Sequence, residues 1–511
     1  MTTYLSPGVY TKETDFSFYV TQISTSACGM VGIAEKGPIN KVTLVTSWEQ
    51  FIKKFGSYIQ DGYLAYAARA FFDNGGQALY VTRVAHCTDP TDRTTLAAQP
   101  ASVTLKDRKT GEASQDTLKI SAIDEGKWGE GLSIIISDGS INPETEFNLS
   151  VSIKNEIVEV YRNLSIDESK SNHVEIVVNE YSNYISVDDL SVSANTPDDR
   201  PAIGTFALAD GDDGITGLTD TDYTGDSSQH TGLYAFDEIE DLNILCIPGV
   251  TTAAVITGGI TYAESRKDLL FIAETPMMIE PLDAVDFRKG AGDYTHSAFN
   301  SSYAGLYYPW LVVYDPLTGR NKIVPPTGAI AGCIARSDQK TDVWCAPAGI
   351  DRGRIFGALS LAYKTNRRER DILYADGINV ISSFPDTGIN IWGQKTLQSQ
   401  ASATDRINVR RLMMYVEEAI SQSARFVVFE PHNAQTWRSL VRLINPFMQS
   451  IKGRGGFYDY RVQCDEETNT PQMIDQNQLV ARVFVKPTKT AEFVELSFIL
   501  TTTGADFREV L

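Results

Sequence analysis

The sequence has few cysteines and few histidines for its length. Its 511 residues include six cysteines and five histidines. No two cysteines form a C-x-x-C pair, and no two histidines stand in an H-x-x-x-H or H-E-x-x-H spacing, so the usual zinc-site patterns are absent. Most of the cysteines lie in apolar runs such as residues 243–248. This placement predicts buried free thiols and folding in a reducing compartment.

Long hydrophobic runs are also missing. No window approaches the 18 or so uninterrupted apolar residues that a membrane-spanning helix needs. The first fifteen residues, MTTYLSPGVYTKETD, contain no basic region followed by an apolar core. We therefore expect neither a signal peptide nor direct insertion into a membrane.

Positive charge is scarce. Lysine and arginine number 45 against 65 aspartates and glutamates, which gives a net charge of −20. Non-specific nucleic-acid binding requires a basic surface that displaces counterions from phosphate, so we expect no nucleic-acid partner. A large negative charge favours the solubility of a protomer that must not associate too early.

The length predicts two to four domains. Composition and periodicity divide the chain into six parts. They are an extended arm at 1–20, an α/β segment at 21–90, an inserted antiparallel β-sandwich or barrel at 91–203, an α/β block at 204–390, a C-terminal α+β domain at 391–503 and a second arm at 504–511.

Local patterns within these parts predict individual elements. Ser47 followed by Gln50 predicts a capping box at the start of a helix. Alternating residues predict strands in the inserted part, one of them at 174–178. Helices are expected around 253–266 and after Pro325-Pro326, each next to a buried strand, and this alternation is typical of a parallel sheet covered by helices.

Both ends of the chain contain strand-forming residues. Val9, Tyr10 and Thr11 favour a strand but have no local partner, so this arm is either frayed or added to another sheet edge. Residues 480–486 and 492–501 predict two further strands, and Phe507 and Val510 belong to a second possible arm.

Residues 405–457 differ from the rest of the chain, and we expect two amphipathic helices around a short buried strand there. Between Asp405 and Arg461 nine basic residues stand against five acidic ones. We call these nine the basic island (Arg406, Arg410, Arg411, Arg425, Arg438, Arg442, Lys452, Arg454 and Arg461).

The second of these helices has two stripes. Its buried stripe is expected to contain Trp437, Leu440, Val441, Ile444, Phe447, Met448 and Ile451. A second stripe, formed by Arg438, Arg442, Asn445, Gln449 and Lys452, faces away from the core. It is either an ordinary solvated face or a docking face for an acidic partner. Pro446 predicts a kink or a short break.

No catalytic, cofactor or metal site stands out in the sequence. There is no G-x-G-x-x-G after the first strand of the α/β block, no P-loop and no G-x-S-x-G elbow. His296 lies near Ser297, Ser301 and Ser302, but this proximity does not distinguish it from a surface or core histidine. Residues 210–214 lack the spacing and the closing glutamate of a calcium loop.

Several motifs resemble the contractile-tail sheath proteins of bacteriophages, in family order over nearly the whole chain. They are Tyr4-Leu-Ser-Pro-Gly-Val-Tyr10, Val31-Gly-Ile-Ala-Glu-Lys-Gly-Pro38, Phe71-Phe-Asp-Asn-Gly-Gly76, Tyr80-Val-Thr-Arg-Val84, Lys127-Trp-Gly129, Tyr307-Tyr-Pro-Trp310, Asp315-Pro316, Val324-Pro-Pro326, Ala331-Gly332, Ala335-Arg-Ser-Asp338, Ala346-Pro347, Arg406-Ile-Asn-Val-Arg-Arg411 and Val428-Phe-Glu-Pro-His432 with Trp437. His432-Asn433 and Ser337-Asp338 depart slightly from the usual family residues.

The resemblance implies a sheath subunit, with no enzymatic activity and no cofactor. Such subunits stack as hexameric rings around an inner tail tube and contract to drive the tube through the host envelope. The α/β block would be subtilisin-like in fold only. The terminal arms would be lent to neighbouring subunits, adding strands to the C-terminal domain, which is assembled from both ends of the chain and faces the tube.

The resemblance also implies the partners and the location. Other copies of the chain, the tube protein, and baseplate and tail terminator proteins would be its partners, in a virion tail assembled in the host cytoplasm. Arg438, Arg442 and Lys452 become candidate tube contacts, whereas Arg410 and Arg411 could instead hold the domain together. A sheath from a phage-derived injection particle, a tailocin or a secretion apparatus, and remotely an α/β hydrolase with a β accessory domain, are the alternatives.

Overall fold

The structure is a computed structural model that describes residues 24–89, 92, 94–109, 114–191 and 197–496. The described chain forms two compact units, one ending at Gln422 and one starting at Ser423. We call them the α/β unit and the C-terminal unit.

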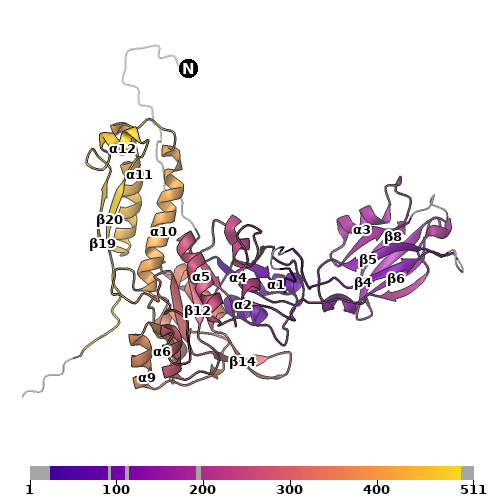
Figure 1. The fold of residues 1–511 in the computed structure, drawn as a ribbon, viewed down its shortest axis with the longest axis horizontal. Helices are drawn as coiled ribbons and strands as arrows, with labels where there is room; N and C mark the ends of the chain where they lie inside the picture. The colour runs from indigo at the N-terminus through magenta and orange to yellow at the C-terminus, as the bar shows by residue number, and fades with distance from the viewer. Residues whose placement is uncertain (1–23, 90–91, 93, 110–113, 192–196, 497–511) are drawn as a thin grey trace, which may run out of the picture. The chain divides into compact units, whose positions relative to one another are not determined.

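An eight-stranded sheet forms the centre of the α/β unit (Figure 1). Its strands, in spatial order, are β18 (Gly388–Ile391), β17 (Ile378–Phe384), β13 (Ala304–Tyr308), β12 (Leu270–Glu274), β11 (Ile244–Cys246), β1 (Cys28–Gly32), β3 (Leu79–Arg83) and β2 (Thr43–Val45). The strands pair in parallel except β18 and β2, the two edge strands, which are antiparallel to their neighbours. The parallel sheet expected for the α/β block is therefore present, and the segment before residue 90 supplies three of its strands.

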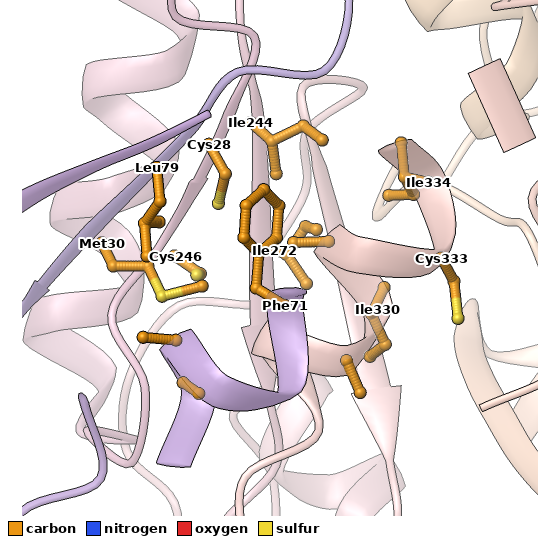
Figure 2. Close-up of a cluster of buried hydrophobic side chains, with 14 of the residues drawn as sticks. Cys28, Met30, Phe71, Leu79, Ile244, Cys246, Ile272, Ile330, Cys333 and Ile334 are labelled. Atoms are coloured by element: carbon orange, nitrogen blue, oxygen red, sulfur yellow. The ribbon is translucent and has the colours of Figure 1, made fainter. Parts of the chain in front are cut away.

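Both faces of this sheet are covered by helices. Met30 and Cys246 on one face pack with side chains from α1 (Trp48–Phe55), α2 (Leu64–Asp73) and α7 (Thr327–Lys340). Figure 2 shows part of this cluster, with Phe71 of α2 and Ile330 and Ile334 of α7 beside the strand residues. The opposite face packs against α5 (Ala253–Arg266), α6 (Pro281–Lys289) and α9 (Arg367–Ala375). Burial on both faces explains why the central strands are apolar throughout instead of alternating.

Smaller elements complete this part of the unit. They are the three-stranded sheet of β14 (Leu311–Asp315), β15 (Arg320–Val324) and β16 (Ser360–Leu361), and the helices α4 (Asp220–Thr224), α8 (Gly349–Arg352) and α10 (Ile407–Ser423), together with the 3₁₀ segment η4 (Gly232–Glu238). Ile407 and Met414 of α10 join the core on the α2 side of the large sheet.

Two antiparallel sheets follow β3 in sequence and share a separate core. One sheet contains β10 (Gly204–Ala207), β6 (Leu132–Asp138), β7 (Phe147–Ile153) and β8 (Glu156–Leu164), and the other contains β4 (Ser102–Lys106), β5 (Asp116–Ala122) and β9 (Ile185–Asp189). The core includes Leu118, Ile134, Leu149 and Val187. Strand β10 lies beyond residue 203, so the antiparallel region extends into the part of the chain expected to belong to the α/β block.

The C-terminal unit is a helix packed on a hairpin. Its elements are η5 (Ala424–Val427), α11 (Ala434–Gly453), β19 (Phe457–Gln463), α12 (Pro471–Asp475) and β20 (Arg482–Pro487). Among the described strands, β19 and β20 pair only with each other, and α11 lies against β19 (Figure 1). Within the described chain, the outer edges of this two-stranded sheet have no strand partner.

Several local predictions are confirmed. Helix α5 has the expected bounds, and α7 begins directly after Pro325-Pro326. Ser47 caps α1 by accepting a hydrogen bond from the Gln50 N–H, although the Gln50 side chain bonds the Thr46 N–H instead of closing a capping box on Ser47.

Two predicted strands are wrong. Residues 174–178 form helix α3 (Val174–Tyr181), because their β-branched residues pack along β9 as a helix face. The short buried strand predicted between α10 and α11 is also wrong. That segment is the 3₁₀ turn η5, followed by Val428 and Phe429, which are 62% and 103% exposed.

Two further expectations concern α11 and the chain after β20. Helix α11 is continuous through Pro446, so no break occurs there. Residues 492–496, the described part of the second strand predicted near the C-terminus, contain no strand, and Phe493, Val494 and Leu496 are exposed.

Candidate functional site

The basic island divides into structural and exposed residues, and Arg411 in α10 is structural. Its Nη1 and Nη2 donate to the Asp338 carboxylate at 2.8 and 2.5 Å, and Nη2 also donates to the Thr25 carbonyl at 2.7 Å. The side chains of Arg411 and Asp338 are 2% and 5% exposed. The ion pair links α10, α7 and the segment before β1, so its role is to hold the α/β unit together.

Arg410 also points into its own unit. Its Nη2 donates to Ser302 Oγ at 2.7 Å, and its guanidinium lies 4.2 Å from the centre of the Tyr303 ring. The sequence left open whether Arg410 and Arg411 only hold the domain together. These contacts favour that role and remove both residues from the candidate docking surface.

Breaking the Arg411–Asp338 pair should strongly destabilise the α/β unit. We expect Asp338→Ala to lower its free energy of unfolding by about 3–5 kcal/mol, because the substitution leaves a buried guanidinium without its counter-charge. The Arg411→Met/Asp338→Leu double variant should lose less than Asp338→Ala alone. Urea denaturation followed by tryptophan fluorescence measures both, with the exposed Asp351→Ala as control. Equal stability of Asp338→Ala and Asp351→Ala would contradict this role.

Residues of the Val428–His432 motif fix the start of α11. Asn433 Oδ1 accepts hydrogen bonds from the Gln435 and Thr436 N–H groups at 2.9 and 3.1 Å and so caps the helix. The Trp437 indole N–H donates to His432 Nδ1 at 3.3 Å, and His432 Nε2 lies 3.1 Å from the Gln478 carbonyl. His432 thus ties the helix start to the chain before β20, and this fixes which face of α11 is exposed.

The exposed face of α11 carries the three predicted contact residues. Arg438 and Arg442 are exposed, and Arg438 Nε donates to the Ala434 carbonyl one turn earlier at 3.0 Å. Lys452 Nζ lies 2.8 Å from Asp459 on β19, which holds the pKa of Asp459 below its usual value. The structure therefore places the three cations on one helix face, but the charge of Lys452 is already partly neutralised.

The buried stripe of α11 differs slightly from the prediction. Trp437, Leu440, Ile444, Met448 and Ile451 are buried as expected. Leu443 is buried in addition, whereas Val441 and Phe447 are only half-buried. The stripe is therefore rotated toward Leu443, and the cationic stripe remains outside.

The predicted arm residues cannot be placed in the same way. Val9, Tyr10, Thr11, Phe507 and Val510 lie outside the described residues. The described structure does contain a feature that an added strand would use, namely the unpaired edges of the β19–β20 hairpin.

Other residues singled out by the sequence have local roles. His296 Nδ1 lies 2.8 Å from the Ser297 carbonyl, and its ring stacks on Phe299. Asp212 and Asp213 accept hydrogen bonds from the Gly214 and Lys127 N–H groups, so they stabilise turns. All six cysteines are free, and all are buried except the half-buried Cys345, which agrees with the predicted free thiols.

The described residues offer neither a metal cluster nor a membrane-spanning helix. Across the described ranges, no group of three or more histidine, cysteine, aspartate or glutamate side chains is placed to hold a metal ion. None of the helices in the described part of the chain has both the length and the apolar character needed to cross a membrane.

An aromatic pocket and an exposed phenylalanine were missed by sequence reasoning. The pocket lies between α1, α2 and β14 and has a volume of about 440 Å³. The phenylalanine is Phe429, which the apolar run Phe426–Phe429 led us to place in a buried strand. Pro431 and the helix cap Asn433, two and four residues later, were the available signs of a turn.

Three family descriptions match the chain in order. The tail sheath protein Gp18 domain III N-terminal region matches residues 25–84, the phage tail sheath protein central domain matches 216–397, and the phage tail sheath C-terminal domain matches 399–501. Together they cover more than half of the chain, and the region without a match contains the two antiparallel sheets.

Curated relatives carry the same description. The tail sheath protein of Enterobacteria phage T4 is 36% identical over 270 residues, which are 51% of this chain and 41% of that protein. The tail sheath protein of Vibrio phage KVP40 is 42% identical over 212 residues, which are 42% of this chain and 32% of that protein. The matched part thus spans less than half the length of these curated relatives.

Solved structures share the fold over nearly the whole chain. The sheath complex of an extracellular contractile injection system, PVC, in its contracted state has a TM-score of 0.57 at 17% identity and covers 100% of both chains. The sheath tail protein of Listeria innocua has a TM-score of 0.61 at 12% identity and covers 91% of this chain and 95% of its own. The fold is therefore that of sheath proteins from contractile systems. With the three family matches, the chain belongs to the phage tail sheath family.

Proposed function

We propose that the chain is a structural subunit of a contractile phage tail sheath. It polymerises as stacked hexameric rings around an inner tail tube and contracts to drive the tube through the host envelope. The observation that carries this proposal is the ordered match of three sheath regions, from residue 25 to residue 501. The relatives and family matches indicate no enzymatic family.

The wider context follows from the same proposal. The subunit would be part of the virion tail, assembled in the host cytoplasm, with the tube, baseplate and terminator proteins as partners. A solved neighbour, the baseplate of the anti-feeding prophage, matches 98% of this chain at a TM-score of 0.56 and supports the baseplate contact. The helix-covered sheet of the α/β unit would be the subtilisin-like, non-catalytic domain that the resemblance implies.

A sheath of another contractile particle is the second candidate. Solved structures of this fold include the contracted sheath of the anti-feeding prophage, with a TM-score of 0.57 at 17% identity. The curated relatives at 36% and 42% identity are phage proteins, which favours a phage tail.

Overexpression followed by negative-stain electron microscopy tests the proposal. A sheath subunit should form rings or short striated tubes, whereas an α/β hydrolase with an accessory domain should form discrete particles. Discrete particles at all protein concentrations would reject sheath assembly by this chain.

Strand addition would keep neighbouring subunits linked while they move. Both edges of the β19–β20 hairpin lack a partner among the described strands, and an arm added to either edge would gain several main-chain hydrogen bonds. Each contributes about 0.5–1.5 kcal/mol net, so together they would hold through a rigid-body movement. Val9, Tyr10 and Thr11 at one end and Phe507 and Val510 at the other are the proposed arm residues.

Removing the N-terminal arm should abolish assembly without unfolding the subunit. We expect deletion of residues 1–20 to give a soluble, folded protomer that forms no stable sheath, as seen by circular dichroism and electron microscopy. A Val9→Pro/Thr11→Pro variant keeps the chain length but blocks strand pairing, and it should fail in the same way. Normal contractile tubes from either variant would count decisively against the arm.

A further inference from the structure

Phe429 is an apolar side chain that the structure presents to solvent. It is fully exposed, and its backbone has a φ of +70°, in the left-handed region that is unfavourable for a residue with a Cβ. On one side Val428 is also exposed, and on the other Glu430 is exposed. Nothing in the described part of its unit covers this tip, which we call the Phe429 knob (residues 428–430).

The aromatic pocket of the α/β unit is large enough to hold such a side chain. Its wall contains a row of contacting rings, with Trp48 5.4 Å from Tyr58 and Tyr58 4.6 Å from Tyr66, measured between centroids. Exposed Tyr314 and Phe356 extend this apolar surface to the rim. A volume of about 440 Å³ is ample for one phenylalanine, since an apolar cavity of about 150 Å³ holds a benzene ring.

The pocket is formed before any ligand binds. Asn74 at the end of α2 is fully buried, and its amide accepts from the Phe356 N–H at 2.8 Å and donates to the Phe356 carbonyl at 3.1 Å. These two bonds fix the wall segment that carries Phe356. A rigid pocket loses less entropy on binding than a mobile one, which suits a docking site.

Charged side chains lie beside both surfaces. Arg69 lines the pocket, and two further cations lie beside its rings: Lys322 is 4.4 Å from the Tyr66 ring centre and Arg354 is 5.4 Å from the Phe356 ring centre. Asp73 also lines the pocket and pairs with Arg69 at 2.9 Å, and the buried Asp315 accepts a hydrogen bond from the Tyr66 hydroxyl at 2.7 Å. Arg354 is exposed and forms no ion pair with a described residue, and the knob offers one carboxylate, Glu430, beside its aromatic ring.

We propose that Phe429 of one copy inserts into the aromatic pocket of a second copy, with Glu430 beside Arg354. A knob and its pocket on different parts of one chain make a head-to-tail contact, which propagates into rings or helical arrays. The contact rests on the proposed sheath function and specifies one of its subunit interfaces. Aromatic side chains seated in pockets, with arginine nearby, are the usual centre of such interfaces.

Photo-crosslinking tests the contact directly. The photoreactive analogue p-benzoylphenylalanine replaces Phe429 in unlabelled protein, which is then mixed with an equal amount of ¹⁵N-labelled wild-type protein and assembled. We expect crosslinked peptides that join position 429 to residues 48–73 or 311–358, with the labelled and unlabelled forms of the second peptide both present. Crosslinks to the unlabelled form only, to the N-terminal residues 1–23 or to any other segment would overturn the proposal.

Assembly measurements give the size of the effect. We expect Phe429→Ala to raise the protein concentration needed for half-maximal assembly about tenfold or more, the change seen when a central aromatic contact is truncated. Tyr181→Ala, at an exposed tyrosine on α3, is the matched control and should leave this concentration unchanged. Ala358→Trp fills the pocket from its wall and should reproduce the Phe429→Ala result.

The outcomes separate the contact from the proposed function. Assembly of Phe429→Ala at the wild-type concentration would overturn the knob contact while leaving the sheath proposal intact. Failure of the wild-type protein itself to form rings or tubes would instead reject the sheath proposal.

Discussion

Replacing Arg438, Arg442 and Lys452 together by glutamate should prevent assembly on tail tubes at low salt while leaving the protomer folded. The three side chains lie on the exposed face of α11, and their substitution leaves its buried stripe intact. If this face binds an acidic tube surface, charge reversal turns each attraction into repulsion. Co-sedimentation with purified tubes and electron microscopy measure assembly, and circular dichroism measures folding.

A control with the same change in charge separates a local effect from a general one. Each lysine-to-glutamate or arginine-to-glutamate change lowers the charge by two, so the triple variant has −26 instead of −20. Arg367→Glu/Arg368→Glu/Lys340→Glu makes the same change at exposed positions of the α/β unit and should still assemble. Normal assembly of the α11 variant, or equal failure of both variants, would reject the tube-binding face.

The three residues should contribute unequally. An exposed ion pair contributes only about 0.2–1 kcal/mol. Stable binding to a tube would therefore depend on many such ion pairs, repeated in every subunit around and along the tube. Lys452 already pairs with Asp459 at 2.8 Å, and a tube carboxylate would have to compete with that contact. Arg442→Gln should therefore weaken assembly more than Lys452→Gln, and added salt should weaken both.

The sequence predicted the parts of this surface that depend on local spacing. The 3.6-residue period of α11 places Trp437 and Ile444 inside and Arg438 and Arg442 outside, and the structure agrees. The same period could not separate Arg411 from these exposed arginines. Its partner, Asp338, lies 73 positions earlier in the chain, and only the packing of α10 against α7 brings the two together.

Local sequence patterns could not predict the longer-range features of the fold. The sequence predicted an α/β segment at 21–90, but not that its strands β1 and β3 extend the sheet that contains β11 and β12, because strand order depends on contacts more than 200 residues apart. In the same way, the run from Phe426 to Phe429 has the composition of a strand. A strand there would require pairing, and the described structure instead contains a turn that leads to the Asn433 cap.

Glu274 lies in the core of the α/β unit, at the end of β12, and is 2% exposed. Burial raises the pKa of this carboxyl from 4.5 to about 8, and the hydrogen bond that it accepts from the Gly249 N–H opposes the rise only in part. At neutral pH Glu274 is therefore mostly protonated in the folded protein. In the unfolded chain its carboxyl is ionised once the pH exceeds its ordinary pKa of 4.5. The ionisable neighbours Tyr63 and Cys246 both have raised pKa values, so neither supplies a counter-charge.

This difference fixes the sign of a pH effect on stability. A raised pKa in the folded state means that the folded protein binds more protons than the unfolded chain. The stabilising contribution of Glu274 to the free energy of unfolding is therefore fully present below pH 4.5 and is lost as the pH rises through 8. Glu274→Gln keeps an oxygen for the Gly249 N–H and cannot ionise. We compare the free energy of unfolding of Glu274→Gln with that of the wild type at each pH. We expect this difference to be larger at pH 9 than at pH 5 by on the order of 3 kcal/mol, in favour of the variant.

Thermal unfolding at pH 5, 7 and 9 provides the measurement, and the exposed Glu264→Gln on α5 is the matched control. The melting temperature of Glu274→Gln relative to wild type should rise steadily with pH, whereas that of Glu264→Gln should follow the wild type. A Glu274→Gln difference that is constant across these pH values would show that the buried carboxyl does not titrate between the two states. The expected rise instead implies that an ionised Glu274 is destabilising because it is buried, even though it accepts the Gly249 N–H hydrogen bond more strongly in that form. The α/β unit is therefore most stable while this carboxyl keeps its proton.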